Sequence, residues 1–146
     1  MYVVDASVHI ADVRPSEPHH GEARAFLDHV RRTGVAAYGP LILLAEVAAG
    51  IARGTGRPSL ARRLTALLRR VPNFIFLPVD EALGDLAAEV AASQQVRGCD
   101  AVYIALAQQL NATLVTLDGE QRLRAPSAVL AQTPAEALLA SDQERG

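Results

Sequence analysis

The sequence has no lysine, no tryptophan and no long apolar run, and it contains one cysteine, Cys99. A lone cysteine cannot form an internal disulfide, and this scarcity is typical of proteins in the reducing cytoplasm. The N-terminus lacks the basic segment that opens a signal peptide. No apolar run approaches the roughly 18–20 residues that cross a bilayer. We therefore expect a cytoplasmic protein with no membrane association.

Several classes of protein are disfavoured by what is missing. Receiver domains and dehalogenase-like phosphatases need a lysine near the phosphoryl group, and all 14 basic residues here are arginine. No glycine-rich fingerprint follows a predicted strand, which argues against dinucleotide binding. No CxxC motif or histidine cluster accompanies Cys99, so a zinc site is not indicated. The three phenylalanines and three tyrosines are too few for an extensive base-stacking platform. We expect the four histidines to face solvent: His9, His19, His20 and His29.

The length and composition suit one compact domain. With 146 residues, half of them apolar and 21% charged, the chain can build a substantial core. No repeat, low-complexity tract or linker divides it. We expect a single domain over residues 1–146, in which 141–146 form a polar C-terminal tail.

Short apolar runs alternate with amphipathic segments along the chain. The runs predict strands at 2–4, 35–38, 73–79, 113–117 and 128–130. The amphipathic segments predict helices at 18–32, 41–51, 81–96, 101–110 and 134–140, and another from Pro58 to before Pro72. Pro40 is expected in the first turn of the second helix. Alternation of buried strands with helices indicates a parallel sheet covered on both faces. We therefore expect an α/β fold, a three-layer α/β/α sandwich around a mainly parallel sheet of four to five strands.

Three aspartates stand at the boundaries of predicted elements. Asp5 and Asp118 directly follow strands, and Asp100 opens a helix. Each has an ordinary explanation, because the first two suit turns and the third suits an N-cap. Parallel sheets, however, place their binding sites beyond the carboxyl ends of the strands, which is where Asp5 and Asp118 are expected.

Glu46 lies within an otherwise apolar helical segment, LILLAEVAA at 41–49. A buried carboxylate costs several kcal/mol unless it is paired or bound to a cation. Glu46 therefore occupies a solvent-facing line of the helix, pairs with an arginine, or contributes to a functional site. The absence of any other polar side chain between 41 and 52 favours the functional role.

Together the acidic residues predict one metal site, formed by Asp5, Glu46, Asp100 and Asp118. Gathered carboxylates repel one another unless a cation joins them. A set of hard oxygen ligands suits Mg²⁺ or Mn²⁺. Such an ion acidifies a bound water and offsets charge on a scissile phosphodiester, so the set predicts hydrolysis by metal-activated water. The hydroxyls of Ser7 and Thr116 either orient these ligands or serve capping and strand packing.

Four segments resemble the motifs of PIN-domain ribonucleases, in the same order. They are VVDAS at 3–7, LAEV at 44–47, GCDAVYIALA at 98–107 and LVTLD at 114–118. Their order and spacing are similar to those of VapC-like toxins of type II toxin–antitoxin systems, and the resemblance covers nearly the whole chain. Cys99 departs from the small or aromatic residue that is more usual at its position.

The resemblance implies a Mg²⁺- or Mn²⁺-dependent endoribonuclease, the toxin of a toxin–antitoxin pair, that cleaves structured RNA such as tRNA or rRNA. It also implies a homodimer and a cognate antitoxin that inserts a segment into the active-site groove. The four acids map onto the family's acidic quartet, and Ser7 and Thr116 map onto its hydroxyl positions. The alternative is a non-catalytic PIN-like subunit that binds RNA or protein, and the complete set of acids argues against it.

Six arginines and no acid lie between Glu46 and Asp80: Arg53, Arg57, Arg62, Arg63, Arg69 and Arg70. Two arginine pairs within this segment are seven residues apart, which returns them to about one helix face. Such a stripe tracks a phosphate backbone, forms a solvated face with its stems over apolar surface, or contacts an acidic partner segment. All three roles are compatible with the sequence.

Overall fold

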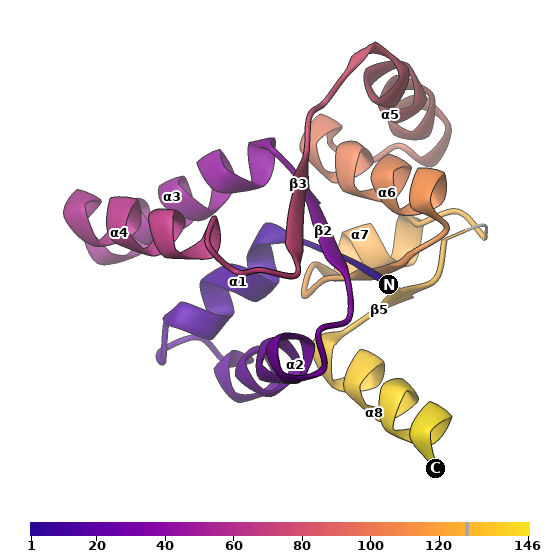
Figure 1. Cartoon of the computed structure of the whole chain (residues 1–146). Coiled ribbons are helices and arrows are strands. Elements are labelled where there is room, and N and C mark those ends of the chain that lie inside the picture. Colours follow the sequence, from indigo (N-terminus) through magenta and orange to yellow (C-terminus); the bar gives the residue numbers. More distant parts are fainter. Residues whose placement is uncertain (128) are drawn as a thin grey trace.

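Five parallel strands form one sheet in the computed structural model of the chain, which describes residues 1–127 and 129–146 (Figure 1). In spatial order they are β3 (Phe74–Leu77), β2 (Ala37–Pro40), β1 (Tyr2–Val4), β4 (Thr113–Val115) and β5 (Ala131–Gln132). The central β1 pairs with β2 on one side and with β4 on the other. Strand order therefore reverses between β1 and β4, the point at which parallel sheets place their binding sites.

Helices cover both faces of the sheet. Within the described residues they are α1 (Ala6–Val13), α2 (His20–Thr33), α3 (Ile42–Thr55), α4 (Pro58–Leu68), α5 (Glu81–Gln94), α6 (Gly98–Leu110), α7 (Gly119–Arg124) and α8 (Pro134–Arg145). On one face, α6 contacts β1, β2 and β4 and is covered by α5. On the other, α1 packs against α2 and α3, and α8 packs against α2. The predicted α/β/α sandwich with a parallel sheet is confirmed.

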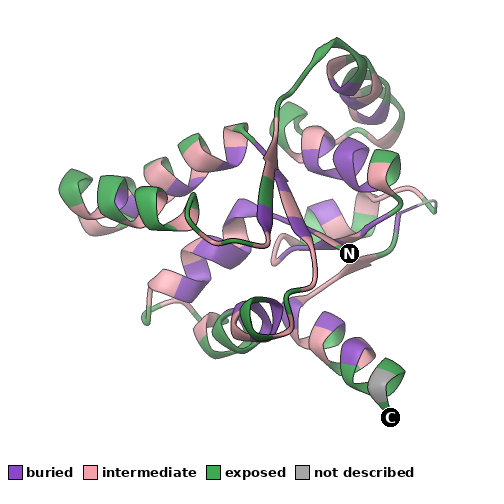
Figure 2. Cartoon of the chain, viewed as in Figure 1, coloured by how far each residue is buried: buried purple, intermediate pink, exposed green. Residues whose placement is uncertain are grey.

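The central strands β1 and β4 are buried from both sides, which explains why they are short and mainly apolar. Val3, Val4, Leu114 and Val115 have no exposed surface. Figure 2 shows buried residues along the sheet and on the inward faces of the helices, with exposed residues on the outer faces. Each fully buried side chain of this kind contributes roughly 1.5–3 kcal/mol, so the strands are held in place mainly by burial. None of the described helices is long and apolar enough to span a membrane.

Two helices, α1 and α7, occupy segments where the sequence suggested only turns. Each begins directly after a strand, with an aspartate as its N-cap. Asp5 accepts a hydrogen bond from the Ser7 amide (3.0 Å), and Asp118 accepts one from the Gln121 amide (3.0 Å). A capping carboxylate satisfies an amide that a helix start leaves free. The same residue that suits a turn therefore starts a helix.

Pro40 lies at the end of β2 and not in the first turn of α3, where we expected it. It pairs in register with Leu77 of β3, and the next amide, that of Leu41, donates to the Leu77 carbonyl (2.8 Å). The missing amide of Pro40 would point toward β1, whose pairing with β2 ends at Tyr38. A proline is tolerated there because no ladder hydrogen bond is lost.

The C-terminal elements also differ from the prediction. The last strand is Ala131–Gln132 and not 128–130, and residue 128 lies outside the described residues. Helix α8 continues to Arg145, so the segment expected as a tail from 141 is helical. Its capping box at Thr133 and Glu136 and the burial of Ala137 anchor this helix to the domain.

The expectation that all four histidines face solvent is wrong for His9 and His29, which are each 5% exposed. His9 packs edge-on against the ring of Phe74, with ring centroids 4.9 Å apart. Burial first, and then the charge of Arg31, lowers its pKa to about 3. His9 is therefore a neutral core residue that packs through its aromatic ring.

Candidate active site

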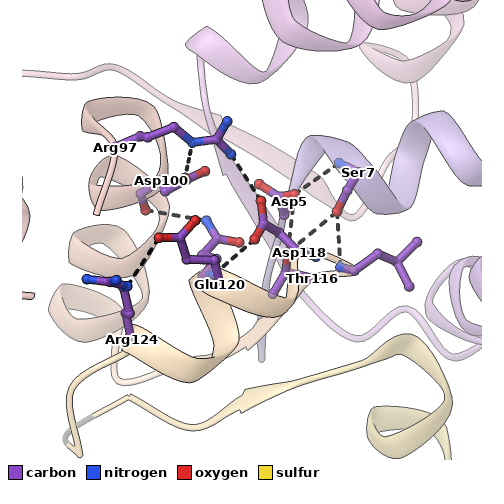
Figure 3. A network of polar contacts seen from close by, with 10 residues as sticks. Asp5, Ser7, Arg97, Asp100, Thr116, Asp118, Glu120 and Arg124 are labelled. Atoms are coloured by element: carbon purple, nitrogen blue, oxygen red, sulfur yellow. Dashed lines mark hydrogen bonds and ion pairs between the residues drawn. The ribbon is translucent and has the colours of Figure 1, made fainter. Parts of the chain in front are cut away.

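The four predicted acids come from four different elements at one edge of the sheet. Asp5 follows β1 and Asp118 follows the adjacent β4. Glu46 lies in the second turn of α3, and Asp100 lies in the first turn of α6. Parallel strands end at a common edge, so the fold brings Asp5 and Asp118 to the same place. Figure 3 shows Asp5, Asp100 and Asp118 around this edge.

Asp5 is the most deeply buried member of the set, with 6% of its surface exposed. Its Oδ2 accepts hydrogen bonds from the Ser7 amide (3.0 Å) and the Thr116 hydroxyl (3.3 Å). Burial raises the pKa of Asp5, the hydrogen bonds from Ser7 oppose this, and the charge of Asp100 raises the pKa further. The pocket therefore disfavours a bare carboxylate and favours any nearby positive charge.

Two hydroxyls tie the ends of β1 and β4 together. The Thr116 hydroxyl donates to Asp5 and accepts from the Asp118 amide (3.0 Å). The Ser7 hydroxyl lies 3.5 Å from that of Thr116 and accepts from the Leu117 amide (3.1 Å). The structure thus places the hydroxyls of Ser7 and Thr116 between two of the acids, where they fix the positions of both strand ends (Figure 3).

Glu46 is partly buried, and its Oε1 atom has no hydrogen-bond partner among the described residues. Burial, and then the charges of Asp5 and Asp100, raise its pKa to about 7. The neighbouring Tyr103 hydroxyl lowers this pKa, but it too lacks a well-formed hydrogen bond within the described residues. Among the described residues no arginine pairs with Glu46, and its side chain is only partly exposed. A partly buried carboxylate with an unpartnered oxygen costs free energy unless a hydrogen-bond donor or a cation satisfies it.

Asp100 is a first-turn residue of α6, because the helix starts at Gly98 with Arg97 as its N-cap residue. It is therefore not the N-cap that the sequence suggested. Its backbone carbonyl accepts from the Gln121 amide nitrogen (Nε2, 3.4 Å), which joins the start of α6 to α7. Its carboxylate pairs with the guanidinium of Arg97 (2.9 Å).

Arg97 is the site residue that sequence reasoning missed. Its side chain, 73% exposed, donates from Nε to Asp100 (2.9 Å) and from Nη2 to Asp118 (3.1 Å). Figure 3 shows it reaching across both carboxylates. Hydrogen bonding to Asp100, followed by the charges of Asp100 and Asp118, raises the pKa of Arg97. The spacing of three residues from Asp100 was visible in the sequence, but the contact with Asp118 depends on the tertiary fold.

The donor chemistry of the site fits a divalent cation of the hard-oxygen type. All four acids supply oxygen atoms, two of them have raised pKa values, and one buried oxygen has no partner. As the side chains stand, no three acidic, histidine or cysteine groups among residues 1–127 and 129–146 are close enough to share an ion. Arg97 holds Asp100 and Asp118 toward itself, so a cation would have to replace it.

Comparisons with known proteins agree with this architecture. A family model described as PIN domain matches residues 2–125. VapC20 from Mycobacterium tuberculosis, a sarcin–ricin loop cleaving toxin, is similar with a TM-score of 0.73 and 18% identity over 89% of this chain and 99% of that chain. FitAcB from Neisseria gonorrhoeae gives a TM-score of 0.69 and 24% identity, over 92% of this chain and 98% of that chain. A chain of a toxin–antitoxin complex from Klebsiella pneumoniae gives a TM-score of 0.66 and 17% identity, over 92% of this chain and 98% of that chain. The curated proteins provide no match. At these identities the solved structures share the fold.

Proposed function

The chain belongs to the PIN-domain family, and from this premise we propose that it is a divalent-metal-dependent endoribonuclease. The observation that carries the proposal is the state of Glu46. A carboxylate with an unpartnered oxygen and a pKa raised to about 7, beside two further acids, costs free energy that a bound cation would offset. A purely structural role gives no reason to place it there.

Asp5, Glu46, Asp100 and Asp118 would hold Mg²⁺ or Mn²⁺. When bound, the ion would supply acidification of water and charge stabilisation at the scissile phosphate. Thr116 and Ser7 hold the Asp5 carboxylate through hydrogen bonds, which keeps it directed toward the site. Arg97, once released from Asp100 and Asp118, would present a guanidinium to a phosphate oxygen beside the acids.

We further propose that the chain is the toxin of a toxin–antitoxin pair. Two similar structures support this: one is a sarcin–ricin loop cleaving toxin and the other is a toxin–antitoxin complex. The proposal includes a structured RNA substrate, a cognate antitoxin, a homodimer and a cytoplasmic location.

A second candidate function is a non-catalytic PIN-like subunit that binds RNA or protein. The ion pairs of Arg97 with Asp100 and Asp118 favour it, because they neutralise two of the four acids without a metal. The unpartnered Glu46 oxygen argues against it, since no arginine reaches that carboxylate within the described residues.

Cleavage of total cellular RNA by the purified, partner-free protein tests the proposal. Reactions with Mg²⁺, Mn²⁺ or EDTA would compare the wild type with Asp5→Asn and with Asp85→Asn. Asp85 is an exposed acid on α5, so its variant controls for loss of one negative charge. We expect discrete, metal-dependent fragments from the wild type and Asp85→Asn, and none from Asp5→Asn.

The thermal midpoint separates the two candidates. Mn²⁺ should raise the midpoint of the wild type and of Asp85→Asn but not that of Asp5→Asn. A folded wild type that Mn²⁺ does not stabilise and that cuts no RNA would establish the non-catalytic subunit instead.

A further inference from the structure

The α3–α4 arm, defined as residues 42–70, is an antiparallel helix pair that projects from the body of the domain (Figure 1). It carries six arginines, all exposed: Arg53, Arg57, Arg62, Arg63, Arg69 and Arg70. Its single acid is Glu46, at the end nearest the sheet. The protein as a whole has a net charge of −2, so acids outnumber arginines in the rest of the chain. The arm is therefore the segment with the largest excess of positive charge, which attracts a polyanion.

The arm arginines have no acidic partner, unlike Arg14, Arg24, Arg31, Arg97, Arg122 and Arg124 elsewhere in the described residues. Within the described residues, no ion pair joins any of the six to a carboxylate. The ion pairs formed elsewhere are Arg14–Glu17, Arg24–Asp12, Arg31–Asp12, Arg31–Asp28, Arg97–Asp100, Arg97–Asp118, Arg122–Glu136 and Arg124–Glu120. Arg69 has a different contact, its guanidinium carbon lying 6.0 Å from the centre of the Phe76 ring. The positive charge of the arm is therefore left open to an external anion.

The packing of α4 directs part of this charge outward. Ala61 is buried, and Leu64 and Leu68 pack partly buried against the core, whereas Arg62 and Arg63 lie exposed between these inward positions. Figure 2 shows the outer face of α4 as largely exposed. The helix ends at Leu68, and its C-cap residue Arg69 keeps a helical backbone (φ −61°, ψ −19°), so the arginines at 69 and 70 continue the basic surface at the end of α4.

Helix α3 connects the acidic site to the basic tip. Glu46 and Arg53 are seven residues apart on it, which is about 10 Å along the axis. At the tip, Arg14, the C-cap residue of α1, donates to the Gly54 carbonyl (3.3 Å), but its guanidinium is already paired with Glu17 (2.7 Å). An RNA strand with one phosphate at the four acids would therefore reach the arm within a few nucleotides.

We propose that the α3–α4 arm binds the phosphate backbone of the RNA substrate beside the bond that is cut. This inference rests on the proposed ribonuclease function. Guanidinium groups bind phosphate with two parallel hydrogen bonds, and each contact releases condensed counterions from the RNA. The arm reads no base sequence, because phosphate contacts position a nucleic acid without specifying it.

Salt-dependent binding tests the arm directly. Affinity of the full chain for a short, fluorescently labelled single-stranded RNA would be measured in EDTA over a series of KCl concentrations. We expect Arg62→Gln/Arg63→Gln to reduce the slope of log affinity against log salt by about 1.4, and to weaken binding about 25-fold near 0.1 M salt, at about 0.7 per phosphate contact. Each single variant should show about half of the slope change.

Arg32→Gln is the matched control for each single variant. Arg32 is an exposed arginine of α2, outside the arm, whose Nε donates to the backbone carbonyl of Asp28. Its removal should leave the slope unchanged. Circular dichroism would verify that all variants are folded, as expected for exposed positions.

The outcomes separate this inference from the proposed function. If the wild type cleaves RNA and the arm variants bind and cleave like it, the arm inference is overturned and an acidic protein partner becomes its better occupant. If the wild type binds RNA through the arm but never cleaves it, the inference about the arm is upheld and the ribonuclease proposal fails. If the Arg32→Gln slope falls as much as that of the arm variants, the binding is diffuse and the inference is overturned.

Discussion

Replacing Glu46 with glutamine is predicted to stabilise the metal-free protein at alkaline pH. Its surroundings raise the pKa of this carboxyl from 4.5 to about 7, with burial as the main cause. The folded state therefore holds the proton more tightly than the unfolded state. Ionisation of Glu46 in the folded state costs free energy of folding. This penalty is absent below pH 4.5, where the group is neutral in both states. The penalty grows between pH 4.5 and 7 and is complete above pH 7.

The size of the effect follows from that rise in pKa. At 1.36 kcal/mol per pKa unit, a change from 4.5 to about 7 corresponds to about 3 kcal/mol, as an upper value. Glutamine has nearly the same shape and carries no charge, so Glu46→Gln should gain up to this amount at pH 8 and little at pH 4.5. A gain of 3 kcal/mol raises the thermal midpoint of a chain of this length by roughly 6–12 °C.

Urea unfolding in EDTA at pH 4.5 and pH 8 measures this difference. The urea midpoint should move while the m-value stays constant, since the surface exposed on unfolding does not change. Glu89→Gln, which removes an exposed carboxylate from α5, serves as the control and should move neither midpoint appreciably. Adding Mn²⁺ at pH 8 should make the wild type more stable than Glu46→Gln, because the wild type gains binding energy that the variant lacks.

Two results would refute this reasoning about Glu46. In the first, Glu46→Gln is no more stable than the wild type at pH 8, which would mean that water or a donor already satisfies the carboxylate. In the second, the gain is the same at pH 4.5 and pH 8, which would mean that packing and not charge determines it.

Two further substitutions test the remaining contacts of the site. Arg97→Gln should raise the affinity for Mn²⁺ roughly two- to fivefold, the range of an exposed ion pair. The reason is that the ion then no longer competes with the guanidinium for Asp100 and Asp118. Titration calorimetry measures the affinity, and equal or weaker binding by the variant would contradict this competition. Thr116→Val should lower the free energy of unfolding by about 1–3 kcal/mol, because the Asp5 oxygen and the Asp118 amide each lose a partner. Thr65→Val is its control, since that hydroxyl bonds only within α4, and equal losses in both variants would rule out a special role for Thr116.

Much of the architecture was predictable because it depends on local patterns. Short, continuous apolar runs such as 2–4 and 113–117 can be satisfied only by burial on both faces, and β1 and β4 are buried in that way. Parallel strands that begin at one edge must end at the other. The positions of Asp5 and Asp118 at a common edge therefore followed from their places in the sequence.

The errors in the prediction arose where a residue has two uses with the same local signature. An aspartate after a strand suits a turn or an N-cap, and only the packing of α1 and α7 selects the helix. No local pattern around His9 predicted its burial, and His9 is buried in α1 with Phe74, distant in sequence, against its ring.

The sequence by itself determined the α/β order of elements, the apolar strands and the places of four acids, after β1 and β4 and near the starts of α3 and α6. The tertiary structure alone decided that Arg97 joins Asp100 to Asp118. It also decided that, in the part of the chain that the structure describes, one Glu46 oxygen has no partner and the arm arginines have no acidic partner. The reason is physical. Strand and helix formation depends on neighbours within a few residues, whereas charge pairing and desolvation depend on groups that only the folded chain brings together.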